Sequence, residues 1–143
     1  MPKANVTRND LVKFIANSVA MPTYGGTLYA HFHSADPGLT GTSSTNEVSY
    51  TGYARVAVDR SGSGFTICDP NGTPNASGTS FKNAAEITFP ECTGVSDDVV
   101  ITHLSLCTSG GQILYSAALT ASIRVTNLIT PRVVSGSAIF KEG

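Results

Sequence analysis

The sequence predicts a mostly β protein: a single antiparallel β-sandwich or jelly-roll-like domain with one short N-terminal helix. Apolar residues recur at helical spacing in only one convincing segment, close to the N-terminus. After it, short runs of alternating apolar and polar residues are separated by clusters of Gly, Pro, Asn, Asp and Ser. Because no further helix is available for crossover connections, an antiparallel arrangement is favoured over a parallel sheet.

Thr7 is predicted to cap a helix that opens at Arg8, because Thr7 and Asp10 have the spacing of a capping box. We expect residues 1–6 to be extended, an arm and helix over residues 1–26, and a β-sandwich over residues 27–143. An apolar stripe along the helix must be covered by something, which makes this segment a candidate for assembly. The stripe consists of the candidate assembly residues Leu11, Phe14 and Ile15, followed by Val19.

The rest of the chain is predicted to form short strands between turns rich in residues that tolerate positive φ or fix φ. The strands are expected at about residues 27–34, 53–60, 64–68, 79–82, 85–89, 98–107, 111–119, 121–127 and 131–140. The clearest hairpin is the one whose turn is Ser109-Gly110-Gly111.

The longest polar stretch without a strand pattern is residues 38–49, and its tip carries no charge. A loop of this length is typically functional or mobile. We expect the tip to make few contacts with its own chain and to be ordered by a neighbouring copy in an assembly; the alternative is a flexible surface loop. A Glu47–Arg55 ion pair is expected to fix its base. The candidate binding residues here are Asp36, Pro37, Thr40, Thr42, Glu47 and Arg55.

The low content of charged residues and the near-zero net charge limit the kinds of partner that this protein can bind. Charged residues are 13% of the 143, against roughly 25% in typical soluble domains. This deficit favours packing against like copies, and a homo-oligomer, preferably a trimer, is expected. A net charge of −1 without a basic cluster argues against nucleic acid as a partner. The sequence has no apolar run of the roughly 20 residues that a membrane span needs. The N-terminus lacks the apolar region of a secretory signal.

Enzymatic motifs are absent, and no cofactor or metal is expected. His31 and His33 share one strand face, so with His103 a three-histidine metal site is conceivable; the stronger interpretation is a polar or interfacial strand face. Asp97 and Asp98 would point to opposite faces of a strand, which argues against a paired-carboxylate site. The three cysteines are expected to be reduced packing residues, with a Cys68–Cys92 bridge as the alternative.

One block of the sequence resembles a family of small virion proteins of tailed bacteriophages, often labelled tail-fibre or minor structural proteins. That family carries Leu-His-Thr-Ala-Asp-Pro-Gly, which here is Phe32-His33-Ser34-Ala35-Asp36-Pro37-Gly38. It is followed by Asn46-Glu47-Val48-Ser49 and Gly52-Tyr53-Ala54-Arg55, which fit without change. The resemblance continues more weakly over roughly residues 10–140. A tryptophan-glycine pair expected before Thr102-His103 is replaced by Asp97-Asp98-Val99.

The resemblance implies a non-enzymatic structural protein of the virion, assembled in the host bacterial cytoplasm. Because no repeat or heptad pattern indicates a fibre shaft, the sequence favours a capsid decoration or cement protein that binds the major capsid protein on the head. The alternative is a minor tail or tail-fibre-associated protein that contacts other tail proteins. A carbohydrate-binding module is disfavoured, since the chain has no Trp and only five Tyr to form a binding platform.

Overall fold

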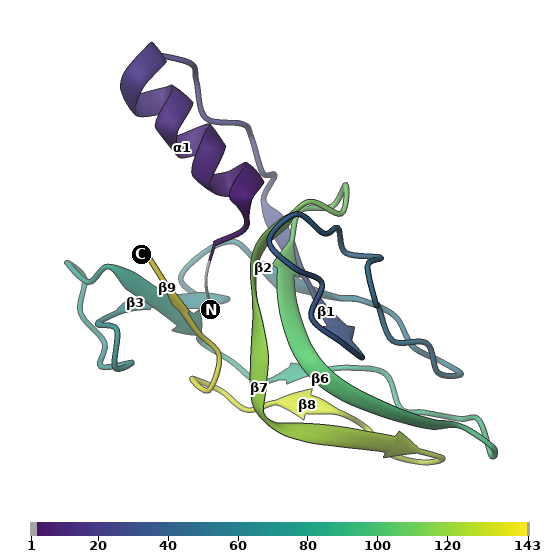
Figure 1. The fold of residues 1–143 in the computed structure, drawn as a ribbon. Coiled ribbons are helices and arrows are strands. Elements are labelled where there is room, and N and C mark those ends of the chain that lie inside the picture. The colour runs from purple at the N-terminus through teal and green to yellow at the C-terminus, as the bar shows by residue number, and fades with distance from the viewer. Residues whose placement is uncertain (1–2, 143) are drawn as a thin grey trace.

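A computed structural model describes residues 3–142 of the chain, which form one helix and nine mostly short strands (Figure 1). The elements in chain order are α1 (Asn5–Asn17), β1 (Thr27–His33), β2 (Val56–Asp59), β3 (Phe65–Cys68), β4 (Ser80–Asn83), β5 (Ile87–Thr88), β6 (Asp98–Cys107), β7 (Ile113–Thr126), β8 (Arg132–Val133) and β9 (Ile139–Lys141). All paired strands are antiparallel. The predicted mostly β, sandwich-like fold with one short helix is confirmed.

The largest sheet has four strands in the order β2-β1-β6-β7. Its two central strands pair Ala30 with Leu106 and Phe32 with Leu104, and all four side chains are buried on one face. A three-stranded sheet, β3-β4-β9, and a two-stranded sheet, β5-β8, complete the β structure. Because side chains alternate across a strand, the other face of β1 and β6 carries the polar residues between these core positions.

The core is rich in aromatic side chains that join the sheets. Phe32 on β1 stacks on Phe89 with 3.8 Å between ring centroids, and Phe81 on β4 stacks on Phe140 of β9 at 4.8 Å. Tyr115 of β7 meets Phe140 edge-on. These rings belong to a single buried cluster or pack against it, so the four-stranded sheet and the β3-β4-β9 sheet share one hydrophobic core.

The hairpin predicted at Ser109-Gly110-Gly111 is confirmed, and it joins the two longest strands, β6 and β7. Here the predicted break near residue 120 is wrong, because β7 runs unbroken from Ile113 to Thr126. Ile101 pairs with Ile123 but His103 pairs with Ala118, so residues 119–122 lie opposite a single residue of β6. This bulge bends the strand without ending it, as the curve of β7 in Figure 1 shows.

Several other predicted strands are shorter in the structure. The strand expected at residues 53–60 begins only at Val56, and that at residues 85–89 is reduced to Ile87–Thr88. The segment 131–140 contains β8 and β9 with a turn between them in place of one strand. The cysteines Cys68, Cys92 and Cys107 are free and buried, so the alternative Cys68–Cys92 bridge does not form.

The predicted cap at Thr7 is wrong. The helix begins at Asn5, so the expected extended arm does not reach residue 6, and residues 1 and 2 lie outside the described residues. Ala4 takes the N-cap position without a side-chain hydrogen bond, while Thr7 is buried within the first turns. Ala4 instead donates its N–H to the carbonyl of Leu114, which ties the helix start to β7.

The other end of α1 is closed by Ser18, whose φ of 55° is left-handed, and by a hydrogen bond of 3.2 Å from Val19 N–H to the carbonyl of Lys13. From its tied N-terminus the helix projects away from the sheets (Figure 1). Its 13 residues are too few to cross a membrane, and no other helix occurs between residues 3 and 142.

Candidate functional site

The polar face of β1 is buried, because residues 34–49, here named the covering loop, fold back over it. His33 has no exposed surface, and His31 is almost completely buried. Val48 N–H donates to the carbonyl of Phe32 at 3.0 Å, and Ser43 N–H donates to the carbonyl of Gly111 at 2.9 Å. The loop is therefore held by β1 on one side and by the β6–β7 turn on the other, and the expectation of few contacts with its own chain is wrong.

The turn that opens the covering loop is built as its sequence predicts. The Asp36 carboxylate accepts a hydrogen bond of 2.8 Å from Gly38 N–H, which has a positive φ of 73°. Asn46, also at positive φ, donates from its side chain to the carbonyl of Asp36 at 3.0 Å. Pro37 is buried, and its carbonyl oxygen lies so close to Gly41 that any Cβ atom there would clash. Only glycine fits position 41.

The tip of the covering loop is polar and ordered by short-range hydrogen bonds. Thr42 N–H donates to the hydroxyl of Thr45 at 3.1 Å, and the hydroxyls of Thr42 and Ser44 are 3.0 Å apart. Thr42 also forms a β-bridge with Gln112. Thr40 and Thr42 are exposed, so the tip offers hydroxyl groups to the surroundings while its backbone is engaged internally.

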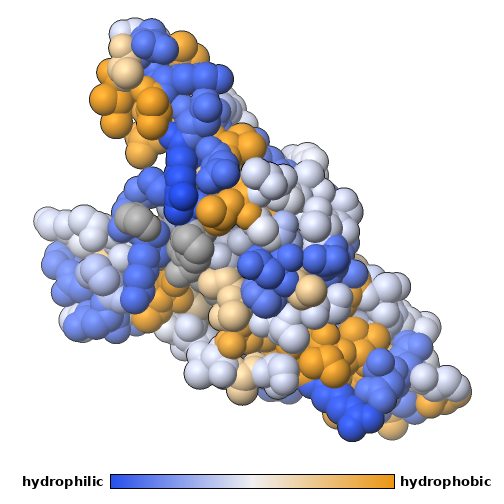
Figure 2. All heavy atoms as spheres, viewed as in Figure 1, coloured by the Kyte–Doolittle hydropathy of each residue, from blue (hydrophilic) through white to orange (hydrophobic). Residues whose placement is uncertain are grey.

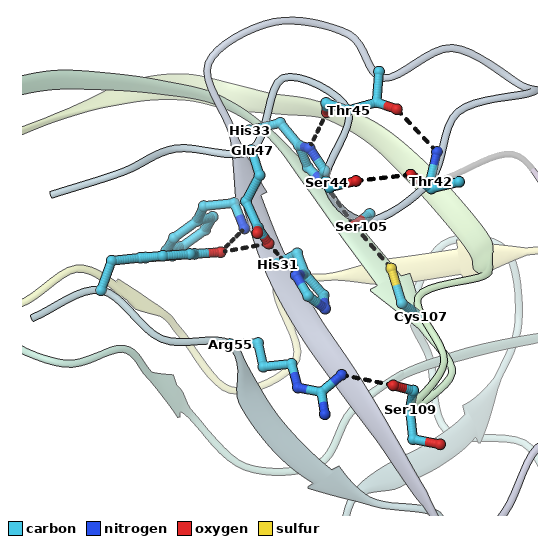
Figure 3. A network of polar contacts seen from close by, with 12 residues as sticks. His31, His33, Thr42, Ser44, Thr45, Glu47, Arg55, Ser105, Cys107 and Ser109 are labelled. Carbon is cyan, nitrogen blue, oxygen red and sulfur yellow. Dashed lines mark hydrogen bonds and ion pairs between the residues drawn. The ribbon is translucent and has the colours of Figure 1, made fainter.

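His33 is the centre of a buried hydrogen-bond chain under the loop (Figure 3). Its Nδ1 lies 2.8 Å from the carbonyl oxygen of Thr45, so Nδ1 carries the proton and donates it. Its Nε2 lies 2.7 Å from the Ser105 hydroxyl, which therefore donates to it. The Cys107 sulfur is 3.3 Å from the same hydroxyl. Burial lowers the pKa of His33, and the bond to Thr45 opposes this only in part.

The Ser105–His33 pair resembles the nucleophile and base of a hydrolase in distance alone. Both residues have zero exposed surface, and Cys107 beside them is equally buried. A nucleophile needs an open face for its substrate. The chain of hydrogen bonds instead connects β1, β6 and the covering loop. Sequence reasoning did not single out Ser105; the available signal was its place at period two with His103 on the polar face of the next strand.

Glu47, near the end of the covering loop, holds the loop to β1 and to Tyr53. Its carboxylate contacts His31 Nδ1 and accepts a hydrogen bond of 3.2 Å from the hydroxyl of Tyr53. The same hydroxyl accepts the N–H of Phe32 at 3.1 Å. Burial raises the pKa of Tyr53, and the nearby Glu47 carboxylate adds to the effect. The tyrosine hydroxyl therefore stays protonated and bridges the carboxylate to the β1 backbone.

The expected Glu47–Arg55 ion pair does not form. The Glu47 carboxylate is already engaged by His31 and Tyr53, whereas Arg55 lies over the ring of Tyr29 with 3.8 Å to its centroid. The Arg55 guanidinium donates to the carbonyl of Ser109 at 2.9 Å, which fastens it to the β6–β7 turn (Figure 3). Two separate sets of contacts, one made by Glu47 and one by Arg55, therefore take the place of the expected ion pair.

The three histidines do not converge on one point. His31 contacts Glu47, His33 contacts Ser105, and His103, although paired with His33 in register, has its Nδ1 2.8 Å from the hydroxyl of Thr102. Within residues 3–142 no group of three or more His, Cys, Asp or Glu side chains could hold a metal ion.

The second candidate surface consists of the exposed apolar side chains at the end of α1 and just after it, here named the α1 tip: Val12, Phe14, Ile15 and Val19. Phe14 is 51% exposed and Ile15 72%, and the β sheets cover neither. Figure 2 shows apolar surface gathered on the projecting helix. Leu11, one turn nearer the sheets, is half-buried and lines a groove between α1 and the β structure. The stripe expected from the sequence is therefore present and largely uncovered, and Val12 adds to it from outside the stripe.

An antiparallel β protein whose internal polar groups hold its own loop, and whose described helix exposes an apolar tip, has the characteristics of a structural protein. Comparison with known families agrees with this class. The model of the family described as "Podophage GP4 fiber I protein gp80" matches residues 2–140, and the chain belongs to this family. It is thus a bacteriophage virion protein of a structural family. No curated protein matches the chain.

Proposed function

We propose that this protein is a multi-copy structural subunit of a fibre-type appendage of the virion and joins its neighbours through the α1 tip. The family description names a fibre protein, which supports this location. The observation that carries the proposal is the helix itself, which leaves the β structure and exposes Phe14 and Ile15 to solvent.

An exposed apolar tip has a physical cost in an isolated molecule. Covering a large, half-exposed apolar side chain contributes on the order of 1 kcal/mol. The tip has four such side chains close together, and clustered exposed apolar residues mark interaction surfaces. The remaining surface carries few charges, which suits close packing with similar surfaces. The subunit is therefore completed by neighbours in the assembly, its own copies first among them.

A capsid decoration or cement protein on the head, bound to the major capsid protein, is the second candidate. It is favoured by a specific observation: residues 3–142 contain one small set of sheets and a 13-residue helix, with no long helix or repeated unit to form a shaft. Under this alternative the α1 tip would contact either another copy or the capsid lattice.

The experiment that separates the two locations is a count of this protein in purified virions, combined with antibody labelling in the electron microscope. A fibre-type subunit predicts on the order of a few dozen copies or fewer and label on the tail, as closed tail symmetry requires. Hundreds of copies and label over the head would establish the decoration role and overturn the fibre proposal. Absence from purified virions would contradict both.

A further inference from the structure

The groove beside α1 is lined mostly by apolar side chains and is open in the isolated chain. It has a volume of about 230 Å³ and lies where the helix leaves the sheets. It is lined by Thr7 and Leu11 of α1, by Met21 and Tyr24 of the segment after the helix, and by residues of the sheets such as Leu114. This volume is several times the roughly 30 Å³ that one water molecule occupies in the liquid. The groove therefore has room for apolar side chains from outside.

The charged groups and the tyrosine hydroxyls at the groove are already paired. Lys3 and Glu142 form an ion pair at its rim, and the Tyr115 hydroxyl donates to Glu142 at 3.0 Å. Tyr24 donates to Asp10 at 3.3 Å. Thr7 has a buried hydroxyl without a partner in the structure, and one hydroxyl is too little to select a polar ligand. The chemistry of the groove consequently suits an apolar occupant.

The same molecule carries a matching apolar projection. Phe14 and Ile15 lie three and four residues after Leu11, so they continue the face of α1 that lines the groove. Leu11 is the middle residue of the helix, which runs from Asn5 to Asn17. If two α1 helices pack antiparallel with their Leu11 residues opposed, the Phe14 and Ile15 end of each lies against the Thr7 end of the other.

We propose that the occupant of this groove is the α1 tip of a second copy of the chain, in a reciprocal contact. The inference rests on the proposed function as a multi-copy subunit and names the contact through which copies join. A 13-residue helix is only about 20 Å long and about 10 Å wide, so one helix face covers far less than the roughly 800 Å² per partner of a typical stable interface. Entry of the tip into the groove adds the buried surface that a helix pair alone lacks.

The contact is tested on the purified full-length chain by measuring its mass in solution at micromolar concentration. We expect a dimer or a larger closed assembly for the unchanged chain. Ile15→Glu is expected to raise the apparent dissociation constant on the order of 100-fold, because it places a charge in a desolvated contact. The matched control is Val95→Glu: Val95 is 85% exposed and lies outside α1 and the groove, and this variant should assemble normally.

A monomer of the unchanged chain, or equal assembly of the Ile15→Glu and Val95→Glu variants, would overturn the inference. The tip would then serve a lipid surface or another virion protein. Circular dichroism of both variants checks that each is folded. The copy number in virions remains a separate measurement, so a failed contact and a failed virion role give different results.

A second experiment locates the contact. Ile15→Cys and Met21→Cys proteins are mixed and treated with a short bis-maleimide, which alkylates one thiol of each. We expect a cross-linked heterodimer, because Met21 lines the groove that the other copy's residue 15 enters. The three native cysteines are buried and do not compete. A mixture of Met21→Cys with Val95→Cys is the control, and cross-linking no greater than in that control would overturn the assigned contact.

Discussion

At the scale of single residues, His33 shows what a buried histidine contributes to this protein. Its two ring nitrogens have different partners, an accepting carbonyl on Thr45 and a donating hydroxyl on Ser105. These partners fix the neutral tautomer with the proton on Nδ1. In the neutral ring, which burial favours, Nδ1 donates to the covering loop and Nε2 accepts from β6, so the ring connects the two.

This arrangement predicts that acid weakens the fold from near neutral pH. Burial lowers the pKa of His33 below its ordinary 6.5, with His31 and His103 adding to the effect and Thr45 and Glu47 opposing it. Below 6.5 the unfolded chain binds a proton that the folded chain does not, so the free energy of unfolding falls as pH falls through this range. Thermal melts between pH 8 and 5 measure it.

The tautomer can be observed directly by nitrogen NMR of the His33 ring at pH 7, where we expect a protonated Nδ1 and an unprotonated Nε2. The aspartates with lowered pKa values, Asp59, Asp97 and Asp98, lose their contribution only below the ordinary value of 3.8, so their effect is separate. A melting temperature that stays constant from pH 7 to 5, or a proton on Nε2, would contradict the assignment.

Gly41 offers a second test at this scale. A Cβ atom at this position would clash with the backbone carbonyl of Pro37, and a backbone atom cannot move aside as a flexible side chain can. We expect Gly41→Ala to lower the free energy of unfolding by about 1–3 kcal/mol through strain in the covering loop. The matched control is Gly62→Ala, because no atom lies within 4 Å of a Cβ atom built there. Denaturant melts of the two variants decide it, and equal stability would count against the tight turn.

The predicted Glu47–Arg55 ion pair is wrong because each residue has another partner, which only the strand register reveals. Glu47 bridges to His33 across the start of the covering loop, which brings its carboxylate to His31 of the same strand. Arg55 reaches the ring of Tyr29 on β1. The polar alternation of β1 was visible in the sequence, whereas the fact that a loop buries it was not.

At the scale of elements, the turns were more predictable than the strands. Asp36-Pro37-Gly38 and Ser109-Gly110-Gly111 both form turns where their residue types predict them. The continuity of β7 could not be predicted, because residues 119–122 lack a period-two pattern of burial where the bulge lies. The helix stripe was predicted correctly, but its start was not, since Thr7 has the residue type of a cap and faces the groove instead.

The N-terminal segment both stabilises the β structure and is proposed to mediate assembly, so a deletion would affect the two together. Ala4 packs with Cys107 and Ile113 in a small buried cluster, and Lys3 pairs with Glu142. We therefore expect removal of residues 1–19 to lower the melting temperature of the β structure as well as its assembly. Ile15→Glu leaves that cluster intact and should keep the melting temperature of the monomer. If the truncated chain melts at the same temperature as the full chain, the structural role of Ala4 is wrong.

At the scale of the whole molecule, the fold explains a structural role for a chain with few charges. One aromatic core joins the sheets, buried polar groups hold the covering loop, and the α1 tip leaves four apolar side chains exposed close to one another in the sequence. The family match places the chain among phage virion structural proteins. Composition alone suggested assembly; the structure adds the surface through which assembly is proposed to occur.

The central claim is that this protein is a repeated structural subunit of the virion whose α1 tip is covered by a neighbour. Cryo-electron microscopy of purified virions tests it most directly. The account predicts several symmetry-related copies of the β structure in the map, each with Phe14 and Ile15 enclosed by adjoining protein density. A map in which the protein is absent, or in which the α1 tip of every copy faces solvent, would contradict it.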